Sequence, residues 1–73
     1  MGKIVDARGL RCPIPVIKTK KALDEIGSGE ILEVKTTDPA SRSDIPALVN
    51  RLGHYLIESK EEAGEFIFII KKI

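Results

Sequence analysis

Hydrophobic and polar residues follow two different periods along the chain, and together they predict four strands and two helices. A short apolar run at residues 3–5 is typical of a strand, and a polar loop over residues 6–11 follows it. From Pro13 onward, apolar residues recur three and four positions apart, as on one face of a helix. Gly27 stands where such a helix ends, so the first third of the chain predicts a strand, a loop and a helix.

The middle of the chain repeats this succession. Residues 30–37 alternate between apolar and polar side chains, which indicates a second strand. A second helix is expected next, with Asp38 and Pro39 forming a turn or a first cap, Ser43 or Asp44 as its N-cap and Gly53 at its end. Its apolar stripe is formed by Ile45, Leu48, Val49 and Leu52.

Two further strands are predicted at residues 55–57 and 66–70, joined by a turn through residues 61–64. The resulting order is β-α-β-α-β-β. A helix after each of the first two strands suggests a parallel crossover, whereas the final hairpin adds antiparallel pairing. We therefore expect an α/β (α+β) two-layer sandwich, with a mixed four-stranded sheet and both helices on one face. The apolar run at 66–70 should have a neighbouring strand on each side, because it would aggregate as an exposed edge.

Length and composition narrow the class of protein. Seventy-three residues predict a single domain spanning 1–73, and 42% hydrophobic with 32% charged residues is typical of a globular chain. No apolar run approaches the roughly 18 residues of a membrane span. The polar N-terminal residues do not resemble a secretory signal, so we expect a cytoplasmic protein.

Cys12 is the only cysteine, which excludes a disulfide within the chain. With one histidine, His54, no structural zinc site is expected, and His54 itself is predicted to lie at the surface. The scattered glycines form no phosphate-binding fingerprint, so no cofactor is expected. Ser41 and Ser43 are expected to cap a helix, since no base for a serine nucleophile is evident.

Charge is unevenly distributed along the chain. Residues 1–21 hold six basic side chains and one acidic one, whereas the remaining residues hold six basic and ten acidic ones. The total of +1 argues against nucleic-acid binding. The basic segment surrounds Cys12, and Lys18, Lys20 and Lys21 lie on the predicted first helix. We expect them to form either a solvated helix face or a docking site for acidic partners.

The residues around Cys12 predict a reactive thiol. Proline is favoured at the first helical position, so Pro13 nominates Cys12 as the N-cap. With Pro13 and Pro15 lacking an N–H, only the N–H groups of Cys12 and Ile14 remain unpaired in the first turn, and both could converge on the sulfur.

The helix dipole, with Arg8 or Arg11 if either folds back, is expected to favour the thiolate or a persulfide anion at this position. No second cysteine or nearby histidine completes a redox or hydrolytic site, which favours acceptance and transfer of sulfur.

Two alternatives concern the position of Cys12. A free cysteine is often a small buried apolar side chain. Pro15 also disfavours helical angles at Ile14, which would start the helix later, leave Cys12 in the loop and weaken the dipole argument.

Two stretches, "DARGLRCPIP" and "DPASRSDIP", resemble the TusA/SirA-like small sulfur carriers, and the resemblance covers about residues 4–73. It implies the β-α-β-α-β-β sandwich and a persulfide on Cys12, with Pro13 and Pro15 shaping the start of the helix. Asp38 and residues 44–46 match the second motif, to which the resemblance assigns a structural role.

The resemblance implies a sulfurtransferase-type carrier. Such a carrier takes sulfur from a cysteine desulfurase or rhodanese-like donor and passes it to an acceptor protein, for tRNA thiolation, cofactor synthesis or sulfur metabolism. It is expected to be a monomer that presents one thiol to successive partners.

Two other functions remain open. The first is a regulatory or RNA-binding module, suggested by the basic first helix and by analogy with a similar domain of a translation initiation factor. Only three aromatic residues, all in predicted strands, argue against it. The second is a redox sensor, in which Cys12 oxidises to sulfenic acid and a partner supplies the resolving thiol.

Overall fold

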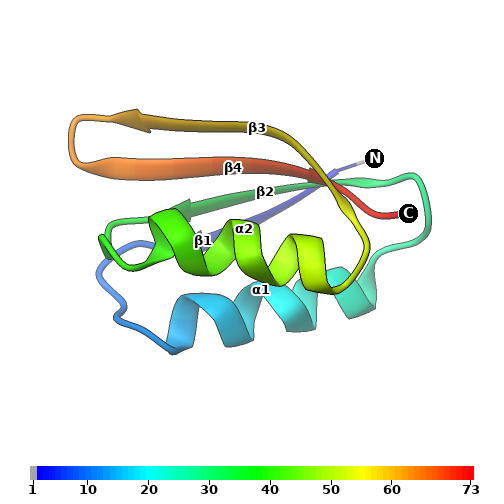
Figure 1. The fold of residues 1–73 in the computed structure, drawn as a ribbon, viewed down its shortest axis with the longest axis horizontal. Helices are drawn as coiled ribbons and strands as arrows, with labels where there is room; N and C mark the ends of the chain where they lie inside the picture. The colour runs from blue at the N-terminus through cyan, green and yellow to red at the C-terminus, as the bar shows by residue number, and fades with distance from the viewer. Residues whose placement is uncertain (1) are drawn as a thin grey trace.

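Four strands and two helices follow one another in the predicted order β-α-β-α-β-β in the computed structural model, which describes residues 2–73 (Figure 1). The elements are β1 (Lys3–Ala7), α1 (Ile14–Glu25), β2 (Ile31–Thr36), α2 (Ser41–Arg51), β3 (Tyr55–Glu62) and β4 (Glu65–Lys71). Within residues 2–73, no helix is both long and apolar enough to span a membrane.

The four strands form one mixed sheet in the order β1-β2-β4-β3. β1 pairs with β2 in parallel, and β4 pairs antiparallel with both β2 and β3. The strand that contains residues 66–70 therefore has a neighbour on each side, as predicted from its continuous apolar run. Both helices cover the same face of this sheet, which confirms the two-layer arrangement (Figure 1).

The core lies between the sheet and the helices. Alternate residues of β2 and β4 point toward the helices and are buried there, among them Val34 and Phe68. Leu23 of α1 and Ile45 of α2 are fully buried on the other side of this layer. Burial of each such side chain contributes about 1.5 to 3 kcal/mol. The predicted apolar stripe of the second helix thus packs on the sheet.

The second helix begins earlier than predicted, at Ser41, and its N-cap is Ala40. The predicted caps, Ser43 and Asp44, are therefore wrong. Asp38 takes over part of the capping role from outside the helix, because its Oδ1 accepts the N–H of Ala40 at 3.2 Å. Its carbonyl oxygen accepts the hydroxyl of Ser41 at 2.6 Å.

β3 runs from Tyr55 to Glu62 and is longer than the predicted strand at 55–57. It pairs with β4 almost to the hairpin, with one register shift between Leu56 and Glu58. Local apolar periodicity missed its polar half, because only pairing with β4 holds that half in the sheet. The hairpin turns at Ala63 and Gly64, which both have positive φ, inside the predicted turn.

Three connections gather at one end of the sheet. Because β1 and β2 are parallel, the loop before α1 and the loop before α2 leave the sheet at the same edge, where Ala7 lies beside Thr36. The β3–β4 hairpin reaches the same end, while both chain termini lie at the opposite end (Figure 1). The N-termini of the two helices are thereby placed side by side.

Candidate functional site

Cys12 lies in the loop between β1 and α1, and its side chain is exposed. The helix begins at Ile14 with Pro13 as its N-cap, so the predicted N-cap at Cys12 is wrong by one residue. A tight turn occupies this position instead, since the N–H of Ile14 donates to the carbonyl of Arg11 at 2.9 Å. The Cys12–Pro13 peptide bond is cis.

The two backbone donors that were expected to converge on the sulfur are both engaged elsewhere. The N–H of Ile14 closes the turn to Arg11, and the N–H of Cys12 donates to Oδ2 of Asp38 at 2.6 Å. A second bond joins the same two loops, from the N–H of Gly9 to Oγ1 of Thr37 at 2.8 Å. The loop donors therefore fix the position of Cys12 in the fold and do not bind its sulfur.

The thiol of Cys12 forms its hydrogen bond with a carboxylate from the second helix. Sγ donates to Oδ2 of Asp44 at 3.3 Å, across 32 positions of sequence. This hydrogen bond raises the pKa of the Cys12 thiol above its ordinary value, and partial desolvation and the negative charges of Asp44 and Asp38 act in the same direction. This shift is opposite to the preference for a thiolate that was expected at this position.

The two arginines predicted to shape the site lie in different surroundings. Arg8 uses Nε and Nη2 to bind both carboxylate oxygens of Asp6, at 2.9 and 2.8 Å, and its Nη1 reaches Glu65 at 3.4 Å. Arg11 is exposed and directly precedes Cys12. Among residues 2–73, neither arginine forms a hydrogen bond or ion pair with Cys12. Their influence on the sulfur stays a prediction.

The first turns of α1 present an apolar and basic face next to the thiol. Ile14 and Ile17 are 42% and 56% exposed, and Lys18 and Lys21 are exposed beside them. Spacings of three and four residues place all four side chains on one side of the helix. Lys20 is also exposed and forms an ion pair with Asp24 at 3.0 Å.

Pro15 has the opposite environment. It is buried on the inner face of α1, and its carbonyl accepts the hydroxyl of Thr19 at 2.7 Å. This proline therefore anchors the start of the helix in the core, while Pro13 and Ile14 stay exposed beside the thiol.

A pair of buried hydroxyl groups supports the loop that carries Asp38. The side chains of Thr36 and Ser41 are 0% and 1% exposed and form a hydrogen bond with each other. The Ser41 hydroxyl also donates to the carbonyl of Asp38. Ser41 was expected only to cap a helix. Its buried bonds instead fix the β2–α2 loop, and with it both carboxylates near Cys12.

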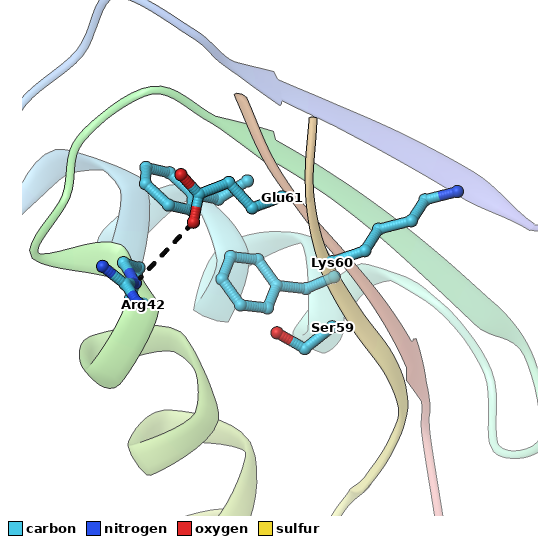
Figure 2. Close-up of a pocket in the computed structure, with 6 residues that line it drawn as sticks. Arg42, Ser59, Lys60 and Glu61 are labelled. Atoms are coloured by element: carbon cyan, nitrogen blue, oxygen red, sulfur yellow. Dashed lines mark ion pairs between the residues drawn. The ribbon is translucent and has the colours of Figure 1, made fainter. Parts of the chain in front are cut away.

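One open pocket, of about 310 Å³, lies between α2 and the β3–β4 hairpin and is not lined by Cys12. The guanidinium of Arg42 lies 5.9 Å from the centre of the Phe66 ring and 4.0 Å from a carboxylate oxygen of Glu61. Ser59 and Glu61 point toward α2, whereas Lys60 points away from it (Figure 2). Nothing in this lining matches the chemistry predicted for the thiol.

His54 lies apart from the thiol. It is half-buried, and its Nδ1 accepts the N–H of Ile73 at 3.2 Å, beside the C-terminus. Within the described part of the chain, no group of three or more His, Cys, Asp or Glu side chains could hold a metal ion.

Comparison with known proteins adds the family. The family model described as Sulfurtransferase TusA matches residues 3–72. The sulfur carrier protein TusA of Allochromatium vinosum is 48% identical over 68 residues, which cover 93% of this chain and 90% of the relative. A putative sulfur carrier protein of Archaeoglobus fulgidus is 49% identical over 70 residues, covering 94% and 91%.

A solved structure agrees with these matches. The crystal structure of a SirA-like protein from Desulfitobacterium hafniense superposes with a TM-score of 0.84 at 32% identity, covering 94% of this chain and 95% of that one. The agreement includes both helices and all four strands of the mixed sheet. On its sequence and its fold alike, this chain belongs to the TusA family.

Proposed function

We propose that residues 1–73 form a single sulfur-carrier domain that bears sulfur as a persulfide on Cys12. The observation that carries the proposal is the exposed thiol of Cys12, held at the meeting point of two loops in a chain whose relatives are named sulfur carriers. The chain has no second cysteine, so the thiol has no resolving partner of its own. An exposed thiol of this kind can take up and release one sulfur atom.

The transfer involves three sulfur atoms, the two of the donor persulfide and the one of the Cys12 thiol. The Cys12 sulfur attacks the terminal sulfur of a persulfide on a cysteine desulfurase or rhodanese-like protein. A new S–S bond forms on Cys12, the S–S bond of the donor breaks, and the donor leaves as a thiol. No net oxidation occurs. In a second transfer of the same kind, the Cys12 persulfide is the donor, and a thiol of the acceptor protein attacks its terminal sulfur. The sulfur then serves tRNA thiolation, cofactor synthesis or sulfur metabolism.

The outer face of α1 is proposed as the docking surface for these proteins. Ile14 and Ile17 supply an apolar centre beside the thiol, and Lys18 and Lys21, with Lys20 nearby, supply positive charge. This combination fits a partner surface with an apolar patch ringed by carboxylates. Such a contact weakens with salt.

The test is the intact mass of the protein after incubation with a cysteine desulfurase, cysteine and pyridoxal phosphate. The wild type should gain the mass of one sulfur atom and lose it again with a reductant. Cys12→Ser should gain nothing, although its thermal unfolding should match that of the wild type. A sulfur gain by Cys12→Ser, or none by the wild type from either a desulfurase or a rhodanese that loads another carrier, would sink the proposal.

A further inference from the structure

Asp44 is the one side chain that the Cys12 thiol contacts by a hydrogen bond among residues 2–73. Its carboxylate is carried by the first turn of α2, a helix anchored in the core by the neighbouring Ile45. Its carboxylate forms no other hydrogen bond or ion pair within the described residues, and its backbone N–H donates to the carbonyl of Ala40 in the helix. The carboxylate thus points at the sulfur from a rigid helix, and among the described residues it accepts a hydrogen bond from the thiol alone.

Two carboxylates act on the sulfur by their charge, and one arginine is its neighbour in the sequence. Asp44 faces it from α2, Asp38 from the loop before α2, and Arg11 precedes it in its own loop. Asp38 is already engaged, since Oδ1 accepts the N–H of Ala40 and Oδ2 accepts the N–H of Cys12. Arginine stays protonated and cannot take a proton. Asp44 is therefore the group placed to receive the thiol proton.

A proton acceptor assists the attack, because the thiol must lose its proton when the new S–S bond forms. The hydrogen bond to Asp44 raises the pKa of the thiol and so disfavours the thiolate, which is the form that attacks a persulfide. The proton must therefore leave as the sulfur attacks. His54 is bonded to the N–H of Ile73 at the C-terminus and does not contact the site.

We propose that Asp44 is a catalytic residue of sulfur transfer, whose Oδ2 takes the proton of the Cys12 thiol as the sulfur attacks the donor persulfide. This inference rests on the proposed function. The S–S bond of the donor breaks, the S–S bond on Cys12 forms, and the proton passes from Asp44 to the leaving thiolate of the donor. The carboxylate is regenerated, and no oxidant or reductant is consumed.

The Asp44 contact has two opposite effects, which makes the inference testable. In the resting protein, the carboxylate disfavours the thiolate and so slows alkylation by a small electrophile that reacts with the free thiolate. During transfer, it accelerates the reaction by accepting the proton. A residue that merely restrained the thiol would slow both kinds of reaction, and its removal would accelerate both.

The experiment compares the wild type with Asp44→Asn in two assays. Alkylation of Cys12 by iodoacetamide at pH 7 should become at least about twofold faster, because the neighbouring negative charge is gone. Single-turnover loading from the desulfurase persulfide that loads the wild type should become about a hundredfold slower, the lower end of the effect of a general base. Asp44→Glu should restore part of the loading rate.

The pH profile separates proton transfer from a structural role. The loading deficit of Asp44→Asn should narrow as the pH rises through the thiol pKa, since solvent then removes the proton. The matched control is Glu58→Gln, which removes one exposed carboxylate from β3, the strand at the opposite edge of the sheet from β1. It should leave both rates unchanged.

Three results would overturn the inference. One is faster loading by Asp44→Asn together with faster alkylation, which would make Asp44 a restraint only. The second is a loading deficit of equal size at every pH, which would indicate a docking or folding defect. The third is an unchanged loading rate. Failure of the wild type to load would instead count against the proposed function, while the alkylation comparison would still report on the Cys12–Asp44 contact.

Discussion

The backbone N–H of Cys12 donates to Oδ2 of Asp38 at 2.6 Å, a bond that ties together two loops 26 positions apart. These loops follow the parallel strands β1 and β2 and therefore leave the sheet at the same edge. The other oxygen of Asp38 accepts the N–H of Ala40, just before the helix that carries Asp44. One carboxylate thus sets the position of the thiol relative to its hydrogen-bond acceptor.

Replacing Asp38 by alanine should weaken both the fold and the site. Two backbone N–H groups lose their acceptor, and we expect the free energy of unfolding to fall by about 1 kcal/mol, since the loops are partly open to water. The Cys12 loop also loses its backbone bond to the loop before α2, which positions the thiol beside Asp44, so sulfur loading should slow several-fold. Urea denaturation and single-turnover loading measure the two effects.

The control for this change is Asp24→Ala, which removes an exposed carboxylate paired only with Lys20. It should change the stability by less than about 0.5 kcal/mol. Equal stabilities of Asp38→Ala and Asp24→Ala would show that the tie between the loops contributes nothing to the fold.

Local pattern was sufficient for the order of the elements, because both helices and the strands β1, β2 and β4 bury one face with a regular period. Ile45, Leu48 and Val49 illustrate this, as they lie on the predicted face of α2 and are buried. The boundaries depended on contacts that a local pattern does not contain. Asp38, which was expected as a turn or first cap, starts α2 at Ser41 in place of Ser43 or Asp44, and pairing with β4 extends β3 into a polar segment.

The N-cap of α1 could be predicted to within one residue, but the direction in which the pKa of the Cys12 thiol shifts could not. The preference of proline for the first helical position points to the correct region, yet the turn from Ile14 to Arg11 and the bond to Asp38 place the cap at Pro13. The contact with Asp44 spans 32 positions of sequence. Only the expected topology pointed to this contact, because parallel strands bring the loops that follow them to the same end of the sheet.

The proposed docking face predicts a separation between partner binding and thiol chemistry. Ile17→Ser and Lys21→Glu should each slow loading from a protein donor by about tenfold, because they remove an exposed apolar contact and a charge from the partner surface. Loading from inorganic polysulfide should be unchanged, since that donor needs no docking. The free energy of unfolding should stay within about 0.5 kcal/mol of the wild type.

The matched control for the docking face is Lys60→Glu, which makes the same charge change on β3. It should load from the protein donor at the rate of the wild type. Raising the salt concentration should slow the wild type more than Lys21→Glu. Equal losses with polysulfide and with the protein donor would mean that these residues act on the thiol and not on docking.

The ion pair between Arg8 and Asp6 predicts that the thermal stability depends on pH, independently of the thiol. Its guanidinium binds both oxygens of Asp6 and holds the pKa of that carboxyl far below its ordinary value of 3.8. A pKa lowered by folding stabilises the folded protein above the unfolded-state value, and this stabilisation is lost as the pH falls below it. Arg8→Gln should therefore lower Tm by a few degrees near pH 7.

The Tm difference between the wild type and Arg8→Gln should shrink as the pH falls below about 3.8, because Asp6 is then protonated in the unfolded state and its pairing with Arg8 no longer favours folding fully. Thermal unfolding followed by circular dichroism across this range measures the difference. The alkylation rate of Cys12 should be the same in both proteins, since Arg8 is held by Asp6 and Glu65. Slower alkylation in Arg8→Gln would indicate that the positive charge of Arg8 favours the Cys12 thiolate after all.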